Sequence, residues 1–497
     1  MDSCLFMVPE RGHSLIDARK AAVVRTPEAV YPMTPPFDPE TAPPEYPWDR
    51  TSCERNIVYE AVRKTLVLLE LDKARIGTSS WNPLGELINP GDMVLIKPNL
   101  VCEGREGKPD QWEQIITSAA VTRAIVDYVL IALSGSGRVV IADSPQTDSD
   151  FELTVGRSGL RSMVDEIGAR ASLPIELLDL RKERWIVRDG VCTGSVSLPG
   201  DPLGEVLIDL GEKSHFNGSS GNAPFYGANY DSEETNRNHR NGHNVYEICG
   251  TALAADVIIN IPKLKTHKKC GMTGCLKGMV GLTGNKNLLP HYRFGPPSKG
   301  GDQFPDDRRN GFLENMLVGE AKKLLVRGGK RTASLLGAMK PLGYKLFGST
   351  RQVIRSGNWS GNDTIWRTVL DLAAVLHFCD SSGVMHPEPV RRFFNLVDGV
   401  VGGEGNGPLD AEPVQSRLLV AGASPLIVDA VSAAVAGINP SFLPIVKNGF
   451  SSNFPLFPCG PDELTVSYHS EETARHGLGE VTALLNLKPH FGWNKSQ

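Results

Sequence analysis

Lysines and glycines gather in one stretch of the chain, NIPKLKTHKKCGMTGCLKGMVGLTGNK, between Asn260 and Lys286. Ammonium groups attract carboxylates and phosphates, and glycines leave backbone amides free to donate hydrogen bonds to an anion. The spacing matches neither the GxxxxGK[ST] pattern of a P-loop nor the GxGxxG pattern of a dinucleotide fold. The stretch therefore predicts a site for a small anion. Its lysines are Lys263, Lys265, Lys268, Lys269, Lys277 and Lys286.

Four residues are our candidates for catalysis. Lys263 and Lys265 lie between apolar residues at the end of a predicted strand, whereas residues 268–269 are expected to face solvent. His267 follows directly, and an imidazole can move protons near neutral pH. Glu404 is flanked by glycine on both sides, which leaves it room to reach a substrate as a general base.

Polar residues that follow other apolar runs are expected to complete the site. In open α/β sheets, ligands collect at the carboxyl ends of the strands. A single strand end of this kind also looks like an ordinary turn, so several of them together carry the prediction. We assign substrate binding to Lys97, Asn99, Asp143, Ser144, Asn260, Thr266, Thr273, Lys277, Lys286, His291, Arg293 and Asn406.

Carboxylates offer a metal site in the sequence VDGVVGGEGNGPLD, which we expect to form a glycine-rich loop. Oxygen ligands on such a loop suit Mg²⁺ or Ca²⁺, and a cation would complement an anionic substrate. Asp398 and Asp429 are the predicted metal ligands, with Mg²⁺ as the candidate cofactor. The alternative is structural, because carboxylates also cap helices and accept hydrogen bonds from loop amides.

The composition is that of a globular protein, with 497 residues, 40% hydrophobic and 22% charged. The net charge of −5 provides no overall attraction to nucleic acid, which we therefore exclude as a partner. Nine scattered cysteines indicate reduced thiols rather than a disulfide framework. The first residues lack the pattern of a secretory signal, and no apolar run reaches the length of a membrane span. We expect a cytoplasmic protein.

Short apolar runs alternate with helical patterns along the chain. Helices are predicted over 56–74 and 117–133, and strands in DMVLIKPNL, RVVIADSP, PIELLDL, EVLIDL and DVIINIPKL. A further helical pattern, DTIWRTVLDLAAVLHF, is expected to pack Trp366 and Leu370 on the sheet. Such alternation is typical of an α/β fold with a mainly parallel central sheet covered by helices on both faces, here with loop and helical insertions.

Four regions follow from these patterns. Residues 1–50 are expected to form a Pro-rich N-terminal strap on the surface, 51–310 the α/β core with the Lys/Gly-rich site loop, 311–360 a basic helical insertion, and 361–497 a C-terminal α/β part that completes the core. Basic and apolar residues interleave over 312–355, which favours peripheral contact with an anionic membrane or a polyanionic partner. The alternative is a helical hairpin whose apolar stripe packs on the core.

Five segments carry a family resemblance: IKPNLV, IADSP, NIPKLKTHKKCGMTGCLKGMVG, VDGVVGGEGNGPLD and ASPLIVDAVSAAVAGINP. They resemble, in order from about Ile57 to about Val446, the domain of unknown function 362 family. The resemblance implies no particular activity. Some relatives carry an added iron–sulfur segment with closely spaced cysteines; here only Cys270 and Cys275 lie close together, so no iron–sulfur cluster is expected.

Three classes of function follow. The leading one is an enzyme, a transferase, lyase or isomerase, that holds a small anionic, phosphorylated or carboxylated, sugar-like metabolite and moves a proton or a group at a cleft between the lysines and the acidic segment. The second is an iron–sulfur-linked redox protein, as among some relatives. The third is a non-catalytic adaptor that uses the basic insertion at a membrane or a partner.

Overall fold

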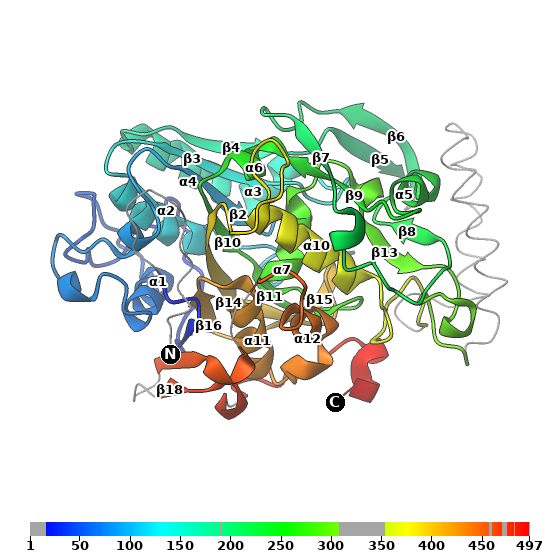
Figure 1. Ribbon diagram of the computed structural model, residues 1–497. Helices are drawn as coiled ribbons and strands as arrows, with labels where there is room; N and C mark the ends of the chain where they lie inside the picture. The colour runs from blue at the N-terminus through cyan, green and yellow to red at the C-terminus, as the bar shows by residue number, and fades with distance from the viewer. Residues whose placement is uncertain are drawn as a thin grey trace.

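A large mixed sheet brings the beginning, middle and end of the chain together (Figure 1). The computed structural model describes residues 16–188, 191–307, 353–456, 460–469, 475–481 and 483–496. The strands follow the spatial order β18 (Arg475–His476), β17 (Thr465–His469), β1 (Lys20–Arg25), β16 (Leu418–Gly422), β14 (Arg392–Asn406), β10 (Val257–Ile261), β2 (Met93–Pro98), β3 (Arg138–Asp143) and β4 (Ile175–Asp179).

The half of the sheet that runs from β14 through β10, β2 and β3 to β4 is parallel throughout. Beyond β14, strand β16 pairs antiparallel with both β14 and β1. The predicted mainly parallel sheet is thus confirmed, with one strand misplaced. The run EVLIDL forms β7 (Glu205–Asp209), which pairs with β9 (Val245–Cys249) in a separate antiparallel ribbon. Leu207 is exposed there, and a short apolar run does not specify which sheet it joins.

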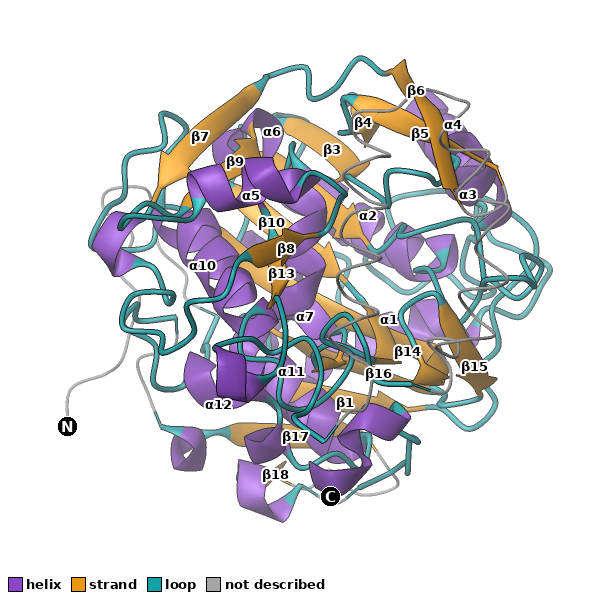
Figure 2. Cartoon of the chain, turned by 90° about the vertical axis from the view of Figure 1, so that its right-hand side faces the viewer, coloured by secondary structure: helices purple, strands orange, loops and turns teal. Residues whose placement is uncertain are grey.

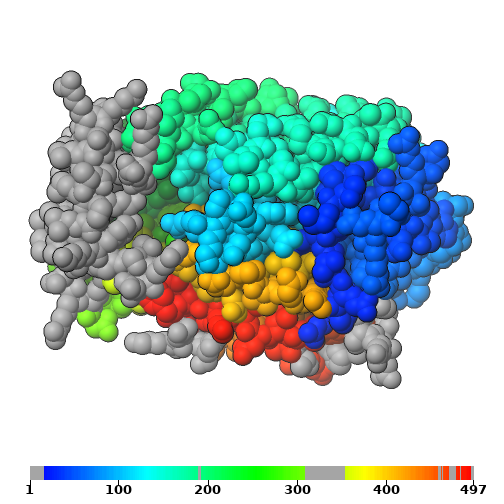
Figure 3. Space-filling view, turned by 180° about the vertical axis from the view of Figure 1, so that it is seen from behind, coloured from blue at the N-terminus to red at the C-terminus, as the bar shows by residue number. Residues whose placement is uncertain are grey.

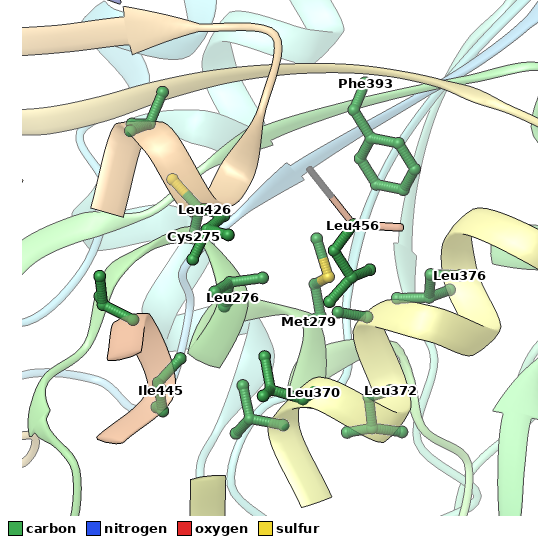
Figure 4. Packing of buried hydrophobic residues seen from close by; sticks show 14 of the residues in the cluster. Cys275, Leu276, Met279, Leu370, Leu372, Leu376, Phe393, Leu426, Ile445 and Leu456 are labelled. Carbon is green, nitrogen blue, oxygen red and sulfur yellow. The ribbon is translucent and has the colours of Figure 1, made fainter. Parts of the chain in front are cut away.

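Helices cover both faces of the sheet, as predicted. Along β2, Val94 and Ile96 join one hydrophobic cluster while Leu95 joins another, because successive side chains of a strand point to opposite faces. The first face is covered by α1 (Ile57–Leu68), α2 (Ala119–Leu133) and α4 (Leu160–Arg170), and the second by α7 (Gly274–Gly278), α10 (Ile365–Phe378), α11 (Pro425–Val435) and α12 (Pro444–Gly449). Figure 4 shows Leu276, Leu370 and Leu426 meeting in the second cluster.

Caps fix where the predicted helices begin and end. The side chain of Asn56 accepts a hydrogen bond from the backbone N–H of Tyr59 at the start of α1, and Ser118 caps α2. Helix α2 ends at Leu133, and its C-cap Ser134, whose φ of 48° is left-handed, lies just before the Gly-Ser-Gly segment. Leu370 of α10 is fully buried, which confirms its predicted core position.

Smaller elements surround the sheet. They are α3 (Phe151–Arg157), the hairpin of β5 (Glu183–Arg188) and β6 (Val191–Ser197), β8 (Phe225–Gly227) paired with β13 (Pro290–Arg293), α5 (Ser232–Asn238), α6 (Gly250–Ala254), β11 (Lys263–His267), β12 (Gly271–Met272) and β15 (Asp410–Val414).

Two segments predicted as loops are strands. Lys263–His267 forms β11, which lies parallel to β14, and the glycine-rich segment after Asp398 continues β14 as far as Asn406. The glycines fit because neighbours approach closely: a Cβ on Gly402 would lie 2.4 Å from Ser416 Oγ, a separation that no real side chain shows. Close packing, rather than loop flexibility, explains the glycine content here.

The N-terminal strap is more deeply built in than expected. Strand β1 lies inside the sheet between β16 and β17, and Tyr31 and Phe37 are buried. Buried Asp38 accepts hydrogen bonds from Arg123 at 2.9 Å and Arg170 at 3.0 Å. Figure 3 shows this part of the chain in dark blue, lying against residues from much later in the sequence. The prediction of a purely surface strap was wrong, because apolar and ionic anchors are scattered among the prolines.

The basic insertion was predicted over 311–360 and the membrane contact over 312–355. Of both segments, the part up to residue 352 lies outside the described residues. Among the helices that the structure does describe, none combines the length and the apolar character needed to cross a bilayer.

The Asp38 ion pairs provide a test of how the N-terminal segment is held. Asp38→Asn leaves two arginines facing a neutral side chain, and breaking a buried pair from one side costs about 3 kcal/mol of unfolding free energy. Urea unfolding followed by circular dichroism should show that loss. Asp49→Asn, at an exposed carboxylate of the same segment, should change the midpoint little. Equal midpoints for wild type and Asp38→Asn would contradict the assigned anchor.

Candidate functional site

A pocket of about 440 Å³ lies at the carboxyl ends of β2 and β3. Strands β8 and β13, which Figure 2 shows in front of α7 and β10, contribute another wall. We call it the lysine pocket after its cationic lining, Lys97, Lys268, Lys269, Lys277 and Lys286. Half of the predicted site residues line it, namely Lys97, Asn99, Asp143, Ser144, His267, Thr273, Lys277, Lys286 and His291.

A buried ion pair forms the floor of the lysine pocket. Lys97 Nζ lies 2.8 Å from Asp143 Oδ1, and Asp143 Oδ2 accepts the backbone N–H of Leu100 at 2.8 Å. The backbone of Gly281 passes directly over the pair: a Cβ there would lie 2.1 Å from the Asp143 oxygen and 2.8 Å from the lysine nitrogen. Only glycine fits at this position. The charge of Lys97 is therefore matched before any ligand binds.

The other deep lysines are less well matched. Lys286 Nζ donates to the hydroxyl of Ser144 at 2.7 Å and to its carbonyl oxygen at 3.0 Å, both neutral acceptors. Burial lowers the pKa of Lys286 to about 8. Lys277 makes neither a hydrogen bond nor an ion pair with any residue that the structure describes, and burial, together with the charge of Lys97, lowers its pKa. Thr273 Oγ1 is also buried without a hydrogen-bond partner in the described part of the chain.

Two histidines in the lysine pocket have complementary proton positions. His267 Nδ1 accepts the backbone N–H of Lys269 at 3.0 Å, so a neutral ring carries its proton on Nε2. His291 Nδ1 donates to the carbonyl oxygen of Leu289 at 2.9 Å, which leaves its Nε2 as an acceptor. Burial and the nearby lysines lower the pKa of His267 well below its usual value and that of His291 to about 3. One ring thus offers a donor and the other an acceptor.

Sequence reasoning missed several residues of this pocket. Lys268 and Lys269, expected on a solvated face, are half-buried in its wall, and Lys269 Nζ donates to the carbonyl oxygen of Ser356 and lies 4.8 Å from the ring centre of Tyr292. Nothing in the local sequence distinguishes these lysines from surface ones. Residues distant in the sequence contact them: Ser356 accepts from Lys269, and Trp493 donates to the carbonyl oxygen of Lys268.

An aromatic pair lines the same pocket and was also missed. Trp185 of β5 and Tyr230 stack with ring centroids 4.8 Å apart and an interplanar angle of 19°. The backbone N–H of Trp185 donates to the carbonyl oxygen of Thr147 at 2.8 Å, which ties the hairpin to the loop after β3. An isolated tryptophan in a hairpin gives no sequence signal for such a role, since aromatic residues are common in strands.

Two predicted catalytic lysines lie outside the lining of the lysine pocket. Lys263 Nζ is fully buried, 3.0 Å from Asp398 Oδ2 and 2.5 Å from the hydroxyl of Tyr31, which in turn donates to Asp398 Oδ1. Lys265 Nζ donates to the carbonyl oxygen of Ile115 at 2.5 Å, and burial lowers its pKa to about 7. Both ammonium groups serve the packing of β11 in this structure, and their catalytic role stays a prediction.

The side chains of five other predicted site residues form hydrogen bonds outside the lysine pocket. Thr266 donates to the carbonyl oxygen of Gly405, Asn260 to that of Cys275, and Arg293 to the hydroxyl of Ser219. Glu404 lies on β14 and accepts the backbone N–H of Lys488, and Asn406 donates to Asp410. None of these five side chains lines the lysine pocket. The prediction of one composite cleft that includes Glu404 is therefore too broad.

The two carboxylates assigned to a metal lie in separate places. Asp398 faces Lys263, whereas Asp429 of α11 accepts the backbone N–H groups of Cys275 at 2.5 Å and Leu276 at 3.0 Å at the start of α7. Burial raises the pKa of Asp429 to about 7. In the described segments, no group of three or more His, Cys, Asp or Glu side chains is placed to hold a metal ion. These contacts favour the structural alternative, and the Mg²⁺ site stays a prediction.

The chain is similar in sequence to known proteins. A family model described as "Domain of unknown function (DUF362)" matches residues 94–201 and 205–434, well over half of the chain. A thylakoid-associated protein of Synechocystis sp. is 26% identical over 204 residues, which is 41% of this chain and 43% of that protein. The chain therefore spans less than half the length of this curated relative.

Lys277→Met provides a test of the unmatched charge. The methionine has a similar shape and needs no partner, so we expect it to raise the unfolding free energy by about 1 kcal/mol at pH 7 in the absence of ligand. The folded pKa of Lys277 lies below its unfolded value of about 10.4, so the folded state releases its proton first and the gain should shrink as the pH rises toward 10.

Chemical denaturation of both proteins at pH 7 and pH 10 measures this difference. Lys108→Met, at an exposed lysine, is the matched control and should have little effect at either pH. A clear loss of stability in Lys277→Met at pH 7 would show that Lys277 has a structural partner.

Proposed function

The chain belongs to the domain of unknown function (DUF362) family, and for this member we propose that the lysine pocket binds a small phosphorylated or carboxylated metabolite and transfers a proton to or from it. The proposal rests on the surroundings of the Lys277 ammonium group in this pocket. Lys277 is half-buried in the pocket wall and its ammonium group has no partner among the described residues, and such sites are expected where a ligand supplies an opposite charge.

The charge balance of the lysine pocket supports an anion. Five lysines line it, and of its two carboxylates Asp143 is already engaged by Lys97 while Asp148 is exposed at the edge. Burial lowers the pKa of Lys277 and of Lys286, and an anion bound near them would favour the charged form of each. A phosphate or a carboxylate would also accept a hydrogen bond from the Thr273 hydroxyl, which has no partner of its own among the described residues.

The two histidines supply a route for proton transfer. His267 presents a donor at Nε2 and His291 an acceptor at Nε2, which are the roles of a general acid and a general base. Burial, together with the surrounding ammonium groups, lowers the pKa of both rings and so favours their neutral forms. A bound anion offsets that repulsion and raises the basicity of His291, so that proton abstraction becomes coupled to binding.

The stacked pair of Trp185 and Tyr230 suits the uncharged part of such a metabolite. An aromatic ring offers a flat apolar face on which the C–H face of a sugar-like ring can pack. Together with the lysines, this favours a ligand with an anionic end and a ring-shaped body. Isomerisation, elimination and group transfer are all reactions that such a proton transfer assists.

Location and partners remain part of the proposal. The seven cysteines found in the described residues are free thiols, which fits a reducing compartment such as the cytoplasm. The Synechocystis relative carries the name of a thylakoid-associated protein, and peripheral membrane contact through residues 312–355 is the corresponding proposal for this chain.

A ligand screen by thermal unfolding tests the anion site. Inorganic phosphate, pyrophosphate or citrate should raise the melting temperature of wild type relative to chloride at equal ionic strength, because a ligand of the folded state adds about 2.7 kcal/mol at one hundred times its Kd. Lys277→Met should lose the shift, whereas Lys108→Met should keep it. Equal shifts in wild type and Lys277→Met, or no shift with any of the three anions, would contradict the proposal.

Nuclear magnetic resonance of the histidine ring protons tests the coupling between binding and proton transfer. We expect the pKa of His291, about 3 in the empty pocket, to rise by at least one unit when phosphate is bound. His291→Gln assigns the signal, and His243, an exposed histidine, provides the internal control whose titration phosphate should not move. An unchanged His291 titration in the presence of bound phosphate would contradict its role as the base.

A further inference from the structure

A serine, a histidine and an aspartate form a hydrogen-bonded chain away from the lysine pocket. Ser452 Oγ lies 2.8 Å from His215 Nε2, and His215 Nδ1 lies 2.7 Å from Asp371 Oδ1. None of the three residues lines the lysine pocket. His215 is 156 residues from Asp371 and 237 residues from Ser452 in the sequence, so the three residues form no local motif.

The hydrogen bonds determine the proton positions in this chain. Because an ionised carboxylate only accepts, Asp371 orients His215 with its proton on Nδ1. A neutral ring then has a lone pair at Nε2, which accepts the hydroxyl proton of Ser452. Ser452 Oγ already accepts the backbone N–H of Phe454 at 3.1 Å, which leaves its own proton free for the histidine. This is the arrangement that activates a serine nucleophile.

Asp371 is held as a fixed, charged partner. It lies on α10, is fully buried, and its Oδ2 accepts hydrogen bonds from the hydroxyls of Ser214 and Tyr246 at 2.5 and 2.8 Å. Its Oδ1 also accepts the backbone N–H of His215 at 2.8 Å. The histidine ring is buried, whereas Ser452 is partly exposed in the segment after α12. Several hydrogen bonds thus hold the buried end in place, and the serine end lies nearer the surface.

A second pocket, of about 490 Å³, is lined by neighbours of these three residues, although none of the three lines it directly. One of its walls is Trp366, whose ring meets the ring of His215 edge-on at 6.2 Å between centroids. Another wall is Asn448 of α12, and the backbone N–H of Ser452 donates to Gly449, the next residue, at 3.4 Å. Trp359 and Phe442 add aromatic surface. The aromatic side of this pocket suits an apolar group of a substrate, while its other walls, which include Asp363 and Lys447, are polar.

We propose that Ser452, His215 and Asp371 are catalytic residues of a second site, which hydrolyses carboxylic esters that carry an apolar group. Ser452 Oγ attacks the ester carbonyl and its proton moves to His215 Nε2. The C–O bond to the alcohol then breaks, and the alcohol leaves with that proton. Water next attacks the acyl-serine while His215 takes one of its protons; the carboxylic acid departs, and His215 returns the proton to Ser452 Oγ. Asp371 stabilises the imidazolium in both steps.

Diisopropyl fluorophosphate tests the proposal without knowledge of the natural ester. An activated serine attacks its phosphorus and displaces fluoride, which leaves a diisopropylphosphoryl group on Oγ. We expect one such group per folded chain of the full-length protein, located on Ser452 by peptide mass spectrometry. Ser452→Ala should abolish labelling, whereas Ser451→Ala, the exposed neighbour, should leave it unchanged.

An ester reporter provides a second measurement. We expect p-nitrophenyl acetate to give a burst of one p-nitrophenol per chain, absent in Ser452→Ala and after labelling, and present in Ser451→Ala and Lys277→Met. The last variant separates this site from the lysine pocket. A folded wild type that stays unlabelled under conditions that fully label trypsin, labelling that persists in Ser452→Ala, or a label on another residue would each overturn the proposal.

Discussion

An ammonium group removed from water needs a partner, and this requirement organises the region where β2, β3 and β10 end and β11 begins. Desolvating a charge costs several kcal/mol, which an opposite charge in good geometry can offset. Lys97 meets Asp143, and Lys263 meets both Asp398 and Tyr31. These pairs hold β2 to β3 and β11 to β14, with the N-terminal segment locked over the second. Lys277 is the contrast: it is carried into the same region on α7 without a described partner.

The sequence predicted the parallel half of the sheet because its strands are buried on both faces and appear as continuous apolar runs. The same property explains the error at β7: an apolar run shows that a segment is extended but not which strand it pairs with. The nine predicted site residues that line the lysine pocket lie at the ends of β2 and β3 or in the segment that leads into and past α7. Their grouping follows from a general rule about strand ends, which needs no knowledge of side-chain direction.

The sequence could not show in which direction each side chain points. Lys263 and Lys265 differ from Lys277 only in context, yet the former point into the packing between β11 and β14. The glycines after Asp398 led to the wrong prediction of a loop for a related reason. A Cβ at Gly403 would lie 2.8 Å from the Cβ of Ala411, so its absence permits close strand packing, as at Gly402. The segment therefore forms a stiff strand that fixes Glu404 next to Lys488, whereas a flexible loop could have delivered it to a substrate.

Helix α10 connects the two sites that the structure suggests. Near its start, Asn362 donates to the carbonyl oxygen of His291, and Thr368 one turn into the helix donates to that of Pro290, so the helix holds β13 at the lysine pocket. Three residues further on, Asp371 anchors His215. Because α10 is buried in the hydrophobic cluster, neither anchor can shift without repacking the core. A buried apolar helix with a few polar contacts can thus position the reactive groups of two separate sites. In this way a well-packed core supports chemistry that takes place outside it.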